Sequence, residues 1–141
     1  MFSDGYLVAR QRFREAAIQL GWALKAYAVD RTGLGGEDLS IDVAISYGAR
    51  TDRTLVLSSG LHSMEGFFGS VVQLGLLKGW VAGDSPPVRC VLLQALSPHG
   101  FAWRRCVNGS NIYLNRNLLP AGEVYGGSPA GYAAVSYTHL T

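Results

Sequence analysis

Two side chains three residues apart, His62 and Glu65, are the groups in this sequence best placed to do metal chemistry. They lie within residues 54–70, TLVLSSGLHSMEGFFGS, where an apolar run and a glycine-containing turn precede a second apolar segment. Side chains at i and i+3 of a helix have Cβ atoms about 5–6 Å apart, so an imidazole and a carboxylate there can share a zinc ion. A loop histidine bonded only to a backbone carbonyl would have the same spacing. The strand and glycine before the histidine favour the metal site.

A second polar segment, residues 114–117 (LNRN), is suited to holding a carboxylate and follows Arg104 and Arg105 in the chain. A planar guanidinium donates two parallel hydrogen bonds to a carboxylate, and a neighbouring amide adds a third. The alternative is a polar loop in which an arginine pairs with a surface acid and contributes little to stability.

The first half of the chain predicts a helix followed by a β-hairpin. Residues 4–20 repeat apolar side chains at helical spacing and end at Gly21. Residues 23–29 and 41–47 alternate with a period of two and flank the turn-rich sequence TGLGGEDLS. The second strand is expected to be half-buried, with one face formed by Ile41, Val43, Ile45 and Tyr47 and the other by Asp42, Ala44 and Ser46.

The second half predicts a strand, a helix and a strand that position the histidine and the glutamate. Residues 54–58 and 88–96 are apolar without alternation, as expected of central strands covered on both faces. Residues 65–80 are long and apolar enough for a helix, so the two strands should be parallel and joined by a right-handed crossover. A ligand site is then expected beyond the carboxyl end of the first strand. Residues 97–127 contain many Gly, Asn and Pro and predict an irregular loop.

Composition indicates one α/β domain. The chain has 141 residues, 48% of them hydrophobic, which is enough for a single buried core. Its formal net charge is +2 with largely scattered Lys and Arg, which argues against a nucleic-acid partner. We find no apolar run as long as a signal peptide or a membrane span, and therefore expect a soluble, cytoplasmic protein without a membrane partner. Cys90 and Cys106 lack CxxC spacing and are expected to be buried, reduced thiols.

Three segments in order, SSGLHSMEGFFGS, SPHGFAWRR and VNGSNIYLNRN, resemble the zinc carboxypeptidase-like superfamily. This superfamily includes carboxypeptidase A, succinylglutamate desuccinylase and aspartoacylase, and the chain is most similar to an uncharacterised bacterial branch of it. The resemblance implies an α/β fold with a mixed, mostly parallel sheet and flanking helices. Residues 1–134 would be the N-terminal portion of this incomplete domain, and residues 135–141 are expected to be a non-native tail.

By this resemblance, His62 and Glu65 bind one zinc ion, and Asn115 with Arg116 binds a substrate carboxylate. Arg105, with Arg104 as the alternative, would polarise the scissile carbonyl. The implied activity is zinc-dependent hydrolysis of an amide bond next to a free carboxylate, in a peptide or a small molecule. Peptide carboxypeptidase and N-acyl amino acid deacylase both stay open. A serine hydrolase is disfavoured, because the sequence has no G-x-S-x-G motif.

The chain also departs from the family's pattern. The family's third zinc ligand, a later histidine, and its catalytic glutamate follow the Asn-Arg motif, and the sequence ends before them. His99 and His139 are expected to face solvent rather than to supply the third ligand. Ser97, Tyr113 and Leu118 replace the Asn, the Asp and the aromatic residue usual in the branch, which leaves substrate choice open. We expect weak zinc binding and little or no hydrolase activity from these 141 residues. A non-catalytic carboxylate-binding or structural protein is the alternative.

Overall fold

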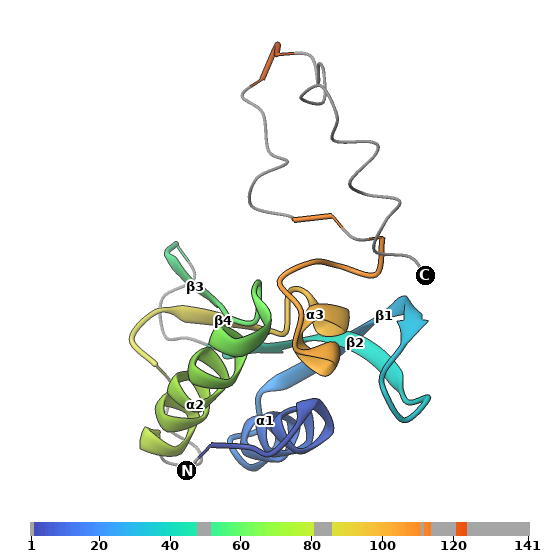
Figure 1. The fold of residues 1–141 in the computed structure, drawn as a ribbon. Helices are drawn as coiled ribbons and strands as arrows, with labels where there is room; N and C mark the ends of the chain where they lie inside the picture. The colour runs from blue at the N-terminus through green and yellow to red at the C-terminus, as the bar shows by residue number, and fades with distance from the viewer. Residues whose placement is uncertain (1, 48–51, 81–85, 111, 114–120, 124–141) are drawn as a thin grey trace, which may run out of the picture.

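The computed structural model describes residues 2–47, 52–80, 86–110, 112–113 and 121–123, apart from the side chains of residues 63 and 64. The elements follow in the order α1 (Tyr6–Gln19), β1 (Ala23–Thr32), β2 (Asp38–Ile45), β3 (Thr54–Ser58), α2 (Ser63–Gly79), β4 (Arg89–Gln94) and α3 (Pro98–Trp103). Figure 1 shows the helices packed around one sheet. This is an α/β fold, as predicted.

The described strands form one mixed four-stranded sheet in the order β1-β2-β4-β3. β1 and β2 form the predicted antiparallel hairpin, and β2 also pairs antiparallel with β4. β3 and β4 run parallel, with Leu57 beside Leu92, and α2 connects them, which confirms the predicted strand–helix–strand unit. The prediction of a mostly parallel sheet is wrong for the described strands, because the hairpin extends the sheet with antiparallel pairs.

The two long helices, α1 and α2, pack side by side against one face of the sheet (Figure 1). The larger core cluster joins these helices to the central strands through Phe13, Ala16, Ala17, Trp22, Ala44, Leu77, Cys90 and Leu92. A second cluster, where α3 meets α1, contains Tyr6, Ala9, Leu39, Ala95 and Phe101. Burying each large apolar side chain stabilises the fold by about 1.5–3 kcal/mol. These clusters therefore hold α1, α2 and α3 against the sheet.

The helix-covered face of β2 carries polar side chains, which corrects the predicted orientation of this strand. Asp42 is 1% exposed, whereas Tyr47, predicted to share the apolar face, is 73% exposed. Arg14 of α1 reaches this face, and its Nη2 donates to Asp42 Oδ1 at 2.9 Å and to Ser40 Oγ at 3.1 Å. The hydrogen bond to Asp42 raises the pKa of the Arg14 guanidinium. A carboxylate can be buried when a cation pairs with it, and alternation alone does not reveal such a partner.

β3 lies at the edge of the described sheet rather than in its middle. Leu55 is 45% exposed and Val56 is 58% exposed. The prediction of a central strand covered on both faces is therefore wrong for β3 within the described residues. The central position predicted for β4 is confirmed, because β4 lies between β2 and β3. A short apolar run without alternation does not identify the neighbours of a strand.

The segment after β4, predicted to be irregular, begins with the short helix α3. Ser97 is its N-cap residue, Pro98 occupies the first turn, and Arg104 closes the helix with a left-handed φ of 54°. Proline suits the first turn, because its missing N–H is not needed there. Among the described residues, no helix combines the length and apolar character that crossing a membrane requires.

The two cysteines differ from each other, although both were expected to be buried. Cys90 is buried in the core, and this burial raises the pKa of its thiol. Cys106 is exposed in the segment after α3, so the expectation is wrong for this residue.

Candidate functional site

The turn between β3 and α2 presents His62 just beyond the carboxyl end of β3. Gly60 adopts a φ of +72°, and His62 is the N-cap residue of α2. A Cβ on Gly60 would lie 2.7 Å from the Cα of Ala95. A left-handed φ also costs residues other than glycine about 1–2 kcal/mol. Both constraints require glycine two residues before the histidine.

The same turn is bonded to the segment that follows β4. The N–H groups of Leu96 and Ser97 donate to the carbonyls of Ser59 and Gly60 at 2.9 and 2.8 Å. A Cβ on Gly66, in the first turn of α2, would lie 3.3 Å from the ring of Phe101 in α3. The starts of α2 and α3 are therefore held together at the carboxyl edge of the parallel pair.

His62 and Glu65 face each other across the first turn of α2. Nδ1 of His62 and Oε2 of Glu65 are 2.9 Å apart and share a hydrogen bond. The side chain of His62 is 17% exposed and that of Glu65 is 80% exposed. The structure thus brings together the two donors that the spacing singles out, at the edge where a ligand site is expected.

The imidazole of His62 is enclosed on its other side. Its Nε2 is buried without a hydrogen-bond partner among the described residues. The ring of Tyr113 lies against it, with centroids 5.0 Å apart and planes inclined by 55°. This aromatic contact and the bond to Glu65 hold the ring with Nδ1 toward the carboxylate.

The donor set fits part of a zinc site. A neutral imidazole nitrogen and a carboxylate oxygen are both ligands that catalytic zinc takes from proteins. Within the described ranges, the structure contains no group of three or more His, Cys, Asp or Glu side chains that could hold a metal. The described residues thus bring together two side chains of zinc-ligand type, whereas a catalytic zinc site uses three protein ligands.

Arg104, the alternative to Arg105, is engaged in packing contacts. Its Nη2 donates to the carbonyl of Asp4 at 3.3 Å, and its guanidinium carbon lies 5.9 Å from the centre of the Phe67 ring. These contacts direct the side chain toward the start of α1.

Arg105 is exposed and lies beside α3, with its guanidinium carbon 5.9 Å from the centre of the Trp103 ring. In the part of the chain that the structure describes, it makes no hydrogen bond or ion pair with His62. Asn115 and Arg116, predicted to bind a carboxylate, lie outside the described residues.

His99 lies in the first turn of α3 and is not the solvent-facing loop residue expected from the sequence. Its Nδ1 is buried without a hydrogen-bond partner among the described residues, and its ring stacks on Trp103 with centroids 5.5 Å apart. Burial lowers the pKa of this imidazole, and the charges of Arg105 and Arg31 lower it further. The signal that could have placed His99 on a helix is Pro98 directly before it, since proline favours a first turn.

Comparisons with known proteins identify a family and similar solved structures. A search of curated proteins finds no match to this sequence. The crystal structure of Macrostomum lignano glutaminyl cyclase is similar, with 19% sequence identity and a TM-score of 0.42. The similarity covers 65% of this chain and 31% of that one, so the chain spans less than a third of that protein. A family model matches residues 2–137, and the chain therefore belongs to the family described as "Protein of unknown function (DUF2817)".

Proposed function

We propose that this protein is a zinc-dependent hydrolase that cleaves an amide bond next to a free carboxylate. The observation that supports this most directly is the convergence of His62 Nδ1 and Glu65 Oε2 within 2.9 Å of each other. The pair lies beyond the carboxyl end of a parallel strand, where α/β proteins commonly bind ligands. The ordered motifs that resemble the zinc carboxypeptidase-like superfamily support the same assignment.

His62 and Glu65 would hold the metal, and each is suited to a different part of that task. His62 is fixed in orientation by Tyr113, so its Nδ1 needs little reorganisation to act as a ligand. Glu65 is on the exposed first turn of α2, and its side chain can adjust to the ion. A zinc ion bound there lowers the pKa of a water ligand to about 7 and polarises a carbonyl group.

The remaining motif residues would orient the substrate. Asn115 and Arg116 would bind the free carboxylate through a guanidinium fork and an amide donor. Arg105 would donate to the carbonyl oxygen as negative charge develops on it. Fixing the substrate at two points converts binding energy into orientation of the amide bond. A peptide with a free C-terminus and an N-acyl amino acid both present this arrangement, so either substrate class is compatible.

A second candidate function is binding of carboxylates without catalysis. It is favoured by the finding that the described residues offer two metal ligands and no third. In that case the fold and the arginine-containing motifs would be used for recognition alone. Zinc affinity separates the two functions, because only the hydrolase requires a metal ion at His62 and Glu65.

The test is a calorimetric titration of zinc into the chain after treatment with EDTA. We expect one zinc ion per chain, with affinity reduced at least tenfold by His62→Ala and by Glu65→Ala. Glu15→Ala is the matched control, because Glu15 is an exposed helical glutamate bonded to Gln11 on α1. Absence of zinc binding, or equal zinc affinity in the unsubstituted chain and the three variants, would overturn the metal site. Either result would favour carboxylate binding without catalysis.

A further inference from the structure

A separate pocket lies at the same edge of the sheet, between the end of β1 and the start of α3. Its volume is about 330 Å³, and its lining includes Val29, Arg31, Leu96, Pro98, His99 and Asn108. Small-molecule pockets span about 300–1,000 Å³, so this one suits a small ligand or one group of a larger ligand.

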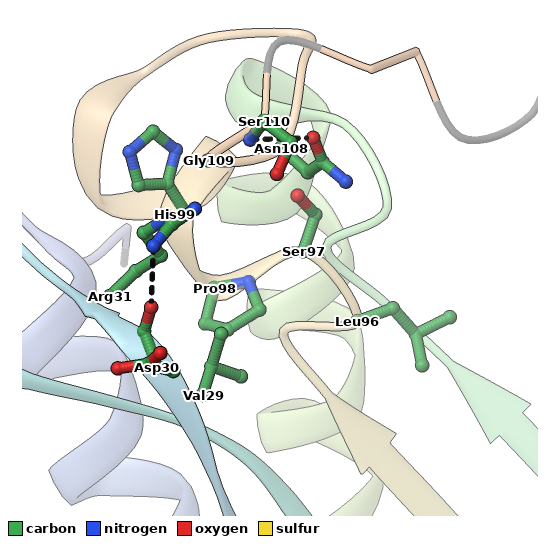
Figure 2. Close-up of a pocket in the computed structure, with 10 residues that line it drawn as sticks. All are labelled: Val29, Asp30, Arg31, Leu96, Ser97, Pro98, His99, Asn108, Gly109 and Ser110. Atoms are coloured by element: carbon green, nitrogen blue, oxygen red, sulfur yellow. Dashed lines mark hydrogen bonds between the residues drawn. The ribbon is translucent and has the colours of Figure 1, made fainter.

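The pocket has an apolar side and a polar side. In Figure 2, Val29, Pro98 and Leu96 lie along its lower part, and Ser97, Asn108 and Ser110 lie across its upper part. A ligand that fills it should therefore combine a short apolar chain with a polar group.

Arg31 is exposed, and its side chain lines the pocket. Its Nη1 donates to the carbonyl of Asp30 at 3.1 Å, as Figure 2 shows. The side chain lies against Gly109, where a Cβ would come within 2.8 Å of Arg31 Cγ and Nε. The absence of a side chain on Gly109 thus leaves the space that the arginine occupies.

His99 and Asn108 add uncharged hydrogen-bonding groups. Burial and the nearby arginines lower the pKa of the imidazole, and its Nδ1 has no hydrogen-bond partner among the described residues. Oδ1 of Asn108 already accepts from the N–H groups of Ser110 and Ile112, at 3.0 and 2.9 Å. The amide Nδ2 is therefore the group that Asn108 can offer to a ligand.

The charges that line the pocket select the ligand. Arg31 supplies one positive charge, and Asp30, which also lines the pocket, supplies a negative charge that disfavours a dianion. A planar guanidinium matches a carboxylate in shape. We propose that this pocket binds a carboxylate with a short apolar chain, through Arg31, His99 and Asn108. The site needs no metal and stands independently of the proposed hydrolase function.

The test follows the backbone amide signals of His99, Asn108 and Gly109 by NMR while the full chain, in EDTA, is titrated with butyrate. Butyramide is the neutral ligand control, because it has the same length and lacks the charge. We expect saturable shifts with butyrate, much weaker ones with butyramide, and about tenfold weaker butyrate binding in Arg31→Gln, since a charge-assisted bond is lost.

Two further variants keep the test decisive. Arg89→Gln makes the same change at the opposite end of β4, where Arg89 is exposed, and should leave butyrate binding unchanged. Gly109→Ala keeps every polar group and should weaken binding, because the new Cβ displaces Arg31. No shift with butyrate, equal binding of butyramide, or equal butyrate affinity in Arg31→Gln and Arg89→Gln would overturn the site.

Discussion

His62 and His99 lie at the same edge of the sheet, yet their neighbours carry opposite charge. Each follows one strand of the parallel pair, and each has one buried ring nitrogen without a hydrogen-bond partner among the described residues. His62 faces the carboxylate of Glu65 at 2.9 Å, whereas His99 is near the guanidinium groups of Arg105 and Arg31. His62 thus has an acidic neighbour, whereas His99 has basic neighbours.

In the two proposals above, the charge of the neighbouring groups separates the roles of the two histidines. Both rings contact an aromatic side chain, Tyr113 for His62 and Trp103 for His99. A carboxylate beside an imidazole favours a metal ion, because two ligands of the types that zinc takes then converge. Arginines beside an imidazole disfavour its charged form and attract a carboxylate.

The largest expected effect concerns Gly60, which joins the two regions. Gly60→Ala should lower the free energy of unfolding by about 2–3 kcal/mol, because it combines a left-handed φ with a backbone clash against Ala95. Gly36→Ala is the matched control, since Gly36 has a φ of +82° and open space around it, and should cost about 1–2 kcal/mol. Urea denaturation measures both. Equal losses would show that the two regions are not held tightly at this point.

The next largest expected effect is that zinc binding and butyrate binding respond to different substitutions. Glu65→Gln should weaken zinc binding about tenfold, because a neutral amide is a poorer metal ligand than a carboxylate. Arg31→Gln should weaken butyrate binding by a similar factor. Calorimetry with zinc and NMR with butyrate, run on both variants, check this. If one substitution weakens the binding of both ligands, the regions around His62 and His99 form one site and the comparison fails.

A smaller effect concerns the titration of His99. Its pKa should lie below 6.5 in the folded chain, and Arg31→Gln should raise it while leaving it below 6.5, because burial is the main cause of the shift. The lowered pKa means that the unfolded chain binds more protons, so stability falls as pH drops from 6.5 toward the folded-state pKa. NMR titration of the imidazole Hε1 signal measures the pKa. An unchanged pKa of His99 in Arg31→Gln would show that Arg31 does not affect this imidazole.

The smallest expected effect is the change in stability when Glu65, the exposed glutamate beside His62, is substituted. Glu65→Gln should change the free energy of unfolding by no more than about 0.5 kcal/mol, because its bond to His62 is largely exposed to solvent. Thermal denaturation in EDTA gives this value. A loss above 1.5 kcal/mol would assign Glu65 a structural role instead.

Apolar patterning predicted most of the elements: helical spacing predicted α1, alternation predicted the hairpin, and apolar runs predicted α2 and the central position of β4. It failed where a partner from another element decides the outcome. The buried face of β2 depends on Arg14, which lies 28 positions from Asp42 in the chain. The edge position of β3 depends on which strands pair with it, and its apolar run carries no such information.

For the candidate site, spacing was sufficient for one part and not for the other. His62 and Glu65 meet because they lie three positions apart at the start of one helix, which brings their side chains together. The pocket at His99 joins α3 and the nearby turn at Asn108 to the end of β1, which is distant from both in sequence. Only folding places Arg31 beside Gly109, so no local motif marks this pocket.

The ion pair between Arg14 and Asp42 also affects the register in which β2 pairs during folding. Val43 and Ala44 are both buried, so apolar contacts alone distinguish poorly between the two faces of this strand. A shift of β2 by one residue would turn every side chain over and leave the Asp42 carboxylate away from its cation. Such a misalignment would leave both charges without a partner. The ion pair therefore destabilises misaligned chains more than it stabilises the correctly folded chain.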